Sequence, residues 1–295
     1  MHRYSMALIA VLMFVSAGVG FGQTLPPLEA DAPARLAASP RHGEWVTVTS
    51  GSDKVKTWIV YPERSDKAPV VLVVHEIYGL TDWVRAVADQ LAAEGFIAVA
   101  PDLLSGKGPG GGGSSSVTKD GARALIADLS PEEISRRLDA AARYATSLPS
   151  ATRAFGVVGY CWGGGISFGY ATQQPDLGAA VVYYGISPSA DALSRVQAPV
   201  LGLYGGNDAR VTSTVPPAQA EMKRLGKRFD VEIYPGAGHA FLRQATGANL
   251  DAAQKAWPRT IAFLRETLEK KETSAAPPSV QIAEVVPAFG IRCHD

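Results

Sequence analysis

Apolar and polar positions along this chain form blocks that predict strands and helices in alternation. Residues 70–74 are apolar without a break, as expected of a central parallel strand buried on both faces. Residues 82–94 then place apolar side chains at helical spacing, and Gly95 supplies a typical C-terminal stop. Ser130, followed by Pro131 and two glutamates, is a capping pattern that predicts the start of another amphipathic helix.

The remaining blocks continue this alternation. Residues 45–49 and 55–61 predict a hairpin with its turn at 50–53. Further strands are expected at 96–100, 155–158, 179–184, 200–204 and 230–234, and further helices near 164–171, 217–225 and 251–268. We therefore predict an α/β fold, a doubly wound and mostly parallel sheet with helices on both faces.

The N-terminal end has a different composition. Residues 1–22 combine a basic start, an apolar stretch and small residues, which is the layout of a secretory signal peptide. The apolar stretch, 6–15, is shorter than the ~20 residues that a membrane-spanning helix needs, and an uncleaved anchor is the alternative interpretation. We expect a periplasmic or secreted protein that is not bound to a membrane once the signal is cleaved.

Composition also divides the rest of the chain. Residues 23–40, rich in proline and alanine, predict a flexible leader, and 272–295 predict a disordered C-terminal tail. Between them, residues 41–271 are long enough for one large α/β domain. Inside that domain, residues 105–116 are mostly glycine and serine and predict a mobile loop.

Charge and motif content narrow the classes of partner. Lysine plus arginine and aspartate plus glutamate each number 28, so net charge offers no attraction for nucleic acid or an anionic membrane. No Cys/His cluster has zinc spacing, and the glycine run 110–113 lacks the lysine of a phosphate-binding loop. We expect no metal, no organic cofactor, a small-molecule substrate and a monomer.

The segment Gly159-Tyr160-Cys161-Trp162-Gly163 carries the most specific chemistry. It matches the G-x-nucleophile-x-G elbow of an α/β-hydrolase, with cysteine in place of serine, between a predicted strand and a predicted helix. The turn is too tight for side chains at the flanking glycines, and the helix N-terminus is expected to favour thiolate over thiol. The alternative is a buried cysteine in a glycine-rich turn.

Two further residues follow the elbow in the order that this fold requires, nucleophile, acid and then histidine. Asp208 follows the strand at 200–204 through a glycine turn, and His239 follows the strand at 230–234 in the same way. We predict Cys161 as nucleophile, His239 as base and proton donor, and Asp208 as the group that orients the imidazole. Singly, Asp208 could cap a turn and His239 could be a solvated loop residue.

Two backbone N–H groups are expected to form the oxyanion hole. One belongs to Trp162, directly after the nucleophile, and the other to Ile77, in the loop after the strand at 70–74. A disulfide between Cys161 and Cys293 would inactivate the nucleophile. We expect both thiols to be free, because Cys293 lies in the terminal tail.

Over residues 44–270 the chain resembles the dienelactone hydrolase family (carboxymethylenebutenolidases). The resemblance is carried by four motifs: His-Glu-Ile-Tyr-Gly from residue 75, Gly-Tyr-Cys-Trp-Gly-Gly-Gly from 159, Gly-Gly-Asn-Asp from 205 and Gly-His-Ala-Phe-Leu-Arg from 238. It implies that Glu76 takes the thiol proton when substrate arrives. It also implies that Arg243 binds a substrate carboxylate and holds Glu76 in the resting enzyme. Tyr78 is a further candidate for substrate contact.

One position departs from the family pattern. Dienelactone hydrolases carry a second substrate-binding arginine shortly after a Pro-Asp-Leu segment, whereas here Lys107 is the nearest cation. Lysine offers a point charge without the bidentate fork of arginine, so it would be a weaker carboxylate clamp.

Two classes of function follow from these residues. The first is hydrolysis of an ester or lactone through a thioester intermediate, with a general carboxylesterase for neutral esters as a variant of it. The second is a non-catalytic binding or redox protein on the same scaffold. The redox variant lacks a Cys-x-x-Cys pair.

Overall fold

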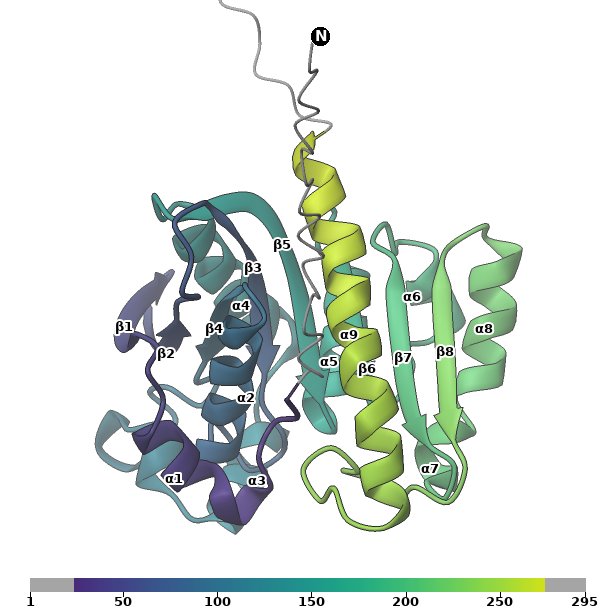
Figure 1. The fold of residues 1–295 in the computed structure, drawn as a ribbon, viewed down its shortest axis with the longest axis horizontal. Coiled ribbons are helices and arrows are strands. Elements are labelled where there is room, and N and C mark those ends of the chain that lie inside the picture. The colour runs from purple at the N-terminus through teal and green to yellow at the C-terminus, as the bar shows by residue number, and fades with distance from the viewer. Residues whose placement is uncertain (1–23, 274–295) are drawn as a thin grey trace, which may run out of the picture.

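An eight-stranded sheet forms the centre of the molecule (Figure 1), which we describe from a computed structural model over residues 24–273. The order of strands across the sheet is β1-β2-β4-β3-β5-β6-β7-β8. The strands are β1 (Gly43–Ser50), β2 (Asp53–Val60), β3 (Ala68–Val74), β4 (Ile97–Pro101), β5 (Ala151–Tyr160), β6 (Ala179–Tyr183), β7 (Val200–Gly205) and β8 (Phe229–Tyr234). The predicted signal peptide, most of the predicted tail and Cys293 lie outside the described residues.

Pairing within the sheet confirms the predicted fold class. β1 pairs antiparallel with β2, and β2 pairs antiparallel with β4. From β4 to β8 every neighbouring pair is parallel. Because parallel strands need crossover connections, helices lie between them in sequence and cover the sheet. The carboxyl ends of β3, β5, β7 and β8 therefore meet at one edge, where a site can assemble.

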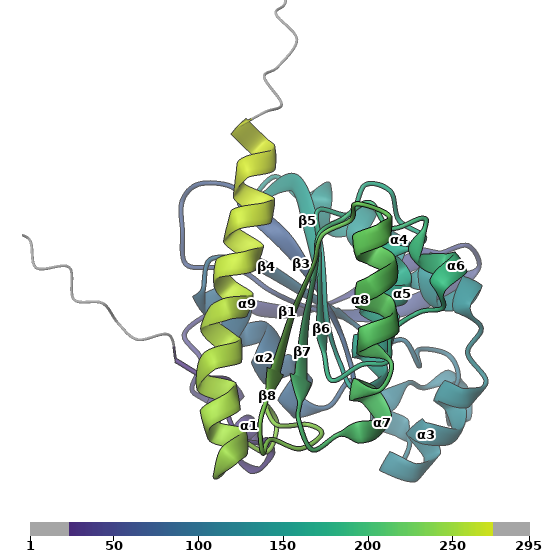
Figure 2. The ribbon, with the colours of Figure 1, turned by 90° about the vertical axis from the view of Figure 1, so that its right-hand side faces the viewer.

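Helices cover both faces of the sheet (Figure 2). α2 (Asp82–Ala93) and α9 (Ala248–Thr273) pack against one face, and α4 (Pro131–Thr146), α5 (Trp162–Ala171) and α8 (Val215–Arg224) against the other. Shorter elements are η1 (Glu29–Asp31), α1 (Ala32–Ala37), η2 (Pro109–Gly111), η3 (Ser114–Ser116), α3 (Lys119–Ala127), α6 (Ala190–Leu193) and α7 (Ala209–Thr212). Within residues 24–273, no helix has the length and apolarity needed to cross a bilayer.

The prediction of a flexible leader at 23–40 is wrong for the part that the structure describes. This leader segment, residues 24–40, contains η1 and α1 and lies along α2. The indole N–H of Trp83 donates to the carbonyl of Pro27 at 3.0 Å, and Ala32 is fully buried. Buried Asp89 on α2 accepts hydrogen bonds from Ser39 and Arg41. A segment rich in proline and alanine can be ordered in this way, because its contacts with α2 fix its conformation.

The glycine-rich loop at 105–116, predicted to be mobile, has fixed contacts at its end. The carboxylate of Asp102 accepts from the backbone N–H of Ser114 at 2.8 Å and from its hydroxyl at 2.5 Å. The Ser114 hydroxyl oxygen also accepts from the N–H of Leu80 at 2.9 Å. The loop continues into α3, a helix absent from the sequence prediction, which begins after Thr118 and borders the active site.

Candidate active site

The turn between β5 and α5 has the strained geometry of a nucleophile elbow. Cys161 has φ 57° and ψ −117°, a left-handed backbone that is uncommon for a residue with a side chain. A Cβ at Gly159 would lie 1.8 Å from the carbonyl oxygen of Gly163, and one at Gly163 would lie 2.4 Å from that of Val74. The two flanking residues must therefore be glycine, as the sequence motif indicates.

The thiol of Cys161 is neutral in the resting site. Burial raises its pKa above the ordinary value, the nearby Glu76 carboxylate raises it further, and backbone N–H groups of Trp162 and Ile77 act in the opposite direction. The N–H group at the helix N-terminus favours thiolate, as expected, but burial and the adjacent acid outweigh it, so the net shift of the thiol pKa is upward. The two N–H groups that face the sulfur are those predicted for the oxyanion hole.

Asp208 and His239 meet at the carboxyl edge of the sheet. Asp208 follows β7, His239 follows β8, and Nδ1 of His239 lies 2.5 Å from Oδ2 of Asp208. The two loops are in contact, since the backbone N–H of Asn207 donates to the carbonyl of Ala237 at 2.9 Å. Asp208 is buried, and this contact holds the imidazole in one orientation, as a catalytic histidine requires.

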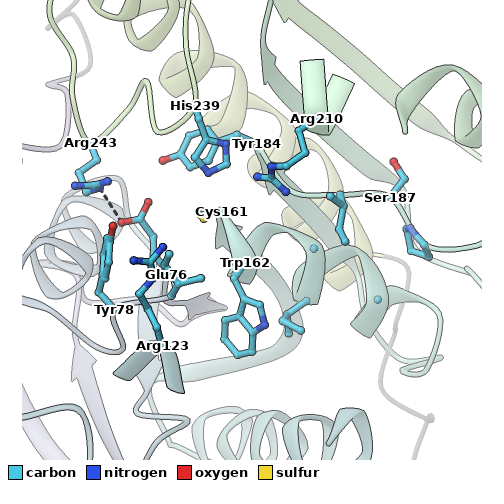
Figure 3. A pocket seen from close by; sticks show the side chains of 16 residues that line it. Glu76, Tyr78, Arg123, Cys161, Trp162, Tyr184, Ser187, Arg210, His239 and Arg243 are labelled. Carbon is cyan, nitrogen blue, oxygen red and sulfur yellow. Dashed lines mark ion pairs between the residues drawn. The ribbon is translucent and has the colours of Figure 1, made fainter. Parts of the chain in front are cut away.

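On the other side of the sulfur, Glu76 lies against Arg243 (Figure 3). Oε2 of Glu76 is 2.8 Å from Nε of Arg243, and the Nε–H is not aligned for a hydrogen bond, so the contact is an ion pair. Burial raises the pKa of Glu76 to about 7 although Arg243 lowers it. Near neutral pH this carboxyl group can therefore both accept and release a proton.

His75 positions the loop that carries Glu76 and Ile77. It is fully buried, its Nδ1–H donates to the carbonyl of Glu76 at 2.8 Å, and its Nε2 accepts from the N–H of Leu103 at 3.3 Å. Burial lowers its pKa, so the ring is neutral. It also stacks on Trp162, with 5.5 Å between ring centroids. The His75 ring therefore contacts Trp162 and is hydrogen-bonded to the backbone just before Ile77. The motif alone did not reveal that His75 supports both predicted oxyanion-hole residues.

A cavity of about 680 Å³ brings the predicted residues together (Figure 3). Asp208, which lies behind His239, does not line the cavity. The other predicted catalytic and oxyanion-hole residues and two of the substrate-binding candidates do: Glu76, Cys161, His239, Ile77, Trp162, Tyr78 and Arg243. The residues that sequence reasoning missed are Tyr184, Arg123 and Arg210. Arg210 follows Asp208 by two positions, and Arg123 lies on the unpredicted helix α3, so no motif marked them.

The structure places Lys107, predicted as a substrate-binding cation, away from the cavity. Its ammonium group lies 2.8 Å from a carboxylate oxygen of Glu133, at the start of α4. Arg137 contacts the same carboxylate at 2.8 Å, and Lys107 does not line the cavity. Its position shortly after the Pro-Asp-Leu segment made it the candidate for a weaker carboxylate clamp, but the chain turns the lysine toward α4 instead.

Metal ligation has no site in the described part of the chain. Among residues 24–273, no three His, Cys, Asp or Glu side chains gather closely enough to hold a metal ion. The acidic and imidazole groups of the cavity are instead paired with Arg243 and with each other. The polar groups gathered around the sulfur are an imidazole, two carboxylates and a guanidinium.

Comparisons with known proteins point to one family. Residues 55–268 match the sequence model of the dienelactone hydrolase family. A relative from Salmonella typhimurium, named "Putative carboxymethylenebutenolidase", is 31% identical over 76% of this chain and 87% of its own length. One of the same name from Escherichia coli is 30% identical over 77% and 88%.

The solved structures include a close likeness of the fold. A crystal structure from Klebsiella pneumoniae, described as a "Putative Dienelactone Hydrolase", has a TM-score of 0.69 and 27% identity, and the match covers 77% of this chain and 99% of that one. The family match spans most of the described sheet and the whole of the cavity lining. This chain therefore belongs to the dienelactone hydrolase family, and with that membership it is a hydrolase of esters or lactones.

Proposed function

We propose that this protein hydrolyses a small ester or lactone with Cys161 as nucleophile, through a thioester intermediate. Glu76, neighbouring the thiol and with a pKa near 7, takes the thiol proton, and the thiolate attacks the carbonyl carbon. The negative charge that develops on the carbonyl oxygen is held by the N–H groups of Trp162 and Ile77.

Collapse of the tetrahedral intermediate releases the alcohol. His239 in its protonated form, oriented by Asp208, donates a proton to the departing oxygen and becomes neutral. The acyl group is left on the sulfur of Cys161 as a thioester.

Hydrolysis of the thioester restores the site. Neutral His239 takes a proton from water, the resulting hydroxide attacks the acyl carbon, and the acid product leaves as the sulfur departs. The thiolate then regains its proton from Glu76. The net reaction is ester plus water to acid plus alcohol, with every proton returned.

The observation that carries this proposal is the convergence on one sulfur of three independently placed parts. The strained elbow follows β5, Asp208 follows β7, and Glu76 follows β3. His239 and Arg243, from the segment after β8, meet the two carboxylates, and both line one cavity with Cys161. A non-catalytic role would leave the strain at Cys161 and the buried carboxyl of Glu76 without a function.

The test is hydrolysis of a para-nitrophenyl ester by mature protein and by Cys161→Ala. We expect the variant to lose at least about 10³-fold in kcat, because the nucleophile is absent. Mass spectrometry of a rapidly quenched reaction should show an acyl adduct on wild-type Cys161. Near-normal turnover by the alanine variant would contradict the proposal.

The signal-peptide pattern of residues 1–22 supports a periplasmic or secreted location, which we propose with it. We also propose that the protein is a monomer. Fractionation of cells that express the full chain, followed by N-terminal sequencing, would test the location, because a cleaved secreted form begins near Gln23.

A further inference from the structure

The leader segment places a second carboxylate on Arg243. Oε2 of Glu29 pairs with Nη1 of Arg243, and the backbone N–H of Glu29 donates to the Arg243 carbonyl at 3.4 Å. The other carboxylate oxygen of Glu29 lies 2.7 Å from the ammonium group of Lys119 on α3. Glu29 thus links the leader segment to Arg243, the partner of Glu76, and to Lys119 on α3.

These contacts hold Glu29 ionised and in place. Burial alone would raise its pKa, but the hydrogen bonds from Lys119 and Arg243 lower it below its ordinary value. On either side in sequence, Pro27 accepts a hydrogen bond from Trp83 and Ala32 is buried. The carboxylate is therefore a fixed part of the site.

The four charges of this cluster balance before any substrate binds. Arg243 and Lys119 contribute two positive charges, and Glu29 and ionised Glu76 contribute two negative ones. Arg243 lines the cavity, whereas Glu29, which contacts Arg243, is not part of the cavity lining. A carboxylate on a substrate would therefore meet a guanidinium whose charge is already compensated.

We infer that Glu29 is a specificity-determining residue: it competes with anionic substrates for Arg243 and so favours uncharged esters or lactones. This rests on the proposed function only for the identity of the reaction. Glu29 is a positioning residue, because it acts on the substrate only through Arg243, whose positive charge it compensates. Arg123 and Arg210 also line the cavity and can attract an anion. Both are present in the wild type and in Glu29→Gln, so their effect cancels when the two proteins are compared.

The test compares two substrates with the same leaving group, mono-para-nitrophenyl succinate, which is anionic, and its uncharged methyl ester. We expect Glu29→Gln to raise the ratio of kcat/KM for the anionic over the neutral substrate about tenfold, equivalent to about 1.4 kcal/mol. The change should lie mainly in KM. Lys119→Gln, which removes a positive charge from the same cluster, should shift the ratio in the opposite direction.

Asp31→Asn is the matched control, since Asp31 is an exposed acid in the same η1 turn with no side-chain ion pair among the described residues. It should leave the ratio unchanged. An unchanged ratio in Glu29→Gln would overturn the inference. So would an equal loss on both substrates together with a lower Tm, since Glu29 would then be only a structural anchor.

A binding measurement separates this inference from the proposed function. In the Cys161→Ala background, calorimetry with monomethyl succinate and dimethyl succinate reports charge preference without turnover. Glu29→Gln should tighten binding of the anion about tenfold relative to the diester. Failure of the proposed function would appear as turnover that is absent or independent of Cys161. Failure of the inference would appear as the same ratio of Kd for anion and diester with and without Glu29→Gln.

Discussion

Two pairs, Asp208 with His239 and Glu76 with Arg243, lie beside Cys161, and they are built in different ways. Figure 3 shows His239 on one side of the sulfur and Glu76 with Arg243 on the other. Asp208 and His239 follow adjacent parallel strands, and the contact between their loops holds them 2.5 Å apart. Glu76 follows β3 and meets Arg243, which is itself held by Glu29 from the leader segment. The first pair depends on neighbouring strand ends. The second depends on segments far apart in the sequence, since Glu29, which holds Arg243, lies 214 positions before it.

The electrostatics of the two pairs differ accordingly. Asp208 has a histidine partner at the cavity wall, whereas Glu76 is buried deeply enough that its pKa rises to about 7 in spite of Arg243. A buried acid beside a neutral thiol is a proton acceptor that is costly to keep ionised. In the mechanism that we propose, the first pair orients the imidazole, and the second transfers the thiol proton at a cost in stability.

Breaking the orientation pair should give the largest effect. Asp208→Asn keeps the size of the side chain but removes the charge that stabilises protonated His239, and we expect kcat to fall about 10³-fold. The measurement is steady-state kinetics on the neutral ester. Asp191→Asn, the same change in the first turn of α6, is the control and should retain full activity. A loss below tenfold would show that Asp208 only caps its turn.

Breaking the proton-transfer pair should give a smaller loss. Glu76→Gln removes the acceptor for the thiol proton, and we expect kcat/KM to fall about 10²-fold. Glu132→Gln, at an exposed position in the first turn of α4, serves as control. Equal activity of wild type and Glu76→Gln would assign the proton transfer to His239 instead.

The same variant tests the cost of burying Glu76. In the fold its pKa is about 7 and its ordinary value is 4.5, so between these values the unfolded chain releases the proton first. The free energy of unfolding should therefore fall as pH rises from about 4.5 to about 7, by about 3 kcal/mol from this group. Urea unfolding at several pH values should show a smaller decline in Glu76→Gln; an identical decline would contradict the raised pKa.

The smallest effect is expected at Lys107, outside both pairs. Lys107→Ala removes a partly exposed ion pair with Glu133 and should change stability by less than about 1 kcal/mol. The ratio of anionic to neutral substrate turnover should stay within twofold of wild type. A severalfold fall in that ratio would restore Lys107 as a carboxylate clamp.

Much of the fold could be predicted because its elements are local in sequence. Each strand from β3 to β8 is expected within a few residues of its observed bounds. Apolar runs mark the strands of the sheet centre that are buried on both faces, whereas β8, at the sheet edge, alternates apolar and polar residues. The same reasoning missed α1, a six-residue helix that contains proline, and α3, which is amphipathic but directly follows the glycine-rich loop. The order of α1 comes from its contacts with α2, and α3 buries Ala122 and Ile126.

The sequence by itself determined the order in which the residues of the site follow one another along the chain. A glycine-flanked Cys161, with Asp208 and His239 after later strands, follows from strand–turn motifs that are complete within a few residues. Only the tertiary structure decided how these groups are charged and which cations face the cavity. The neutral thiol, the displaced Lys107, and Arg243 held by Glu29 depend on burial and on ion pairs between distant segments, which no local pattern records.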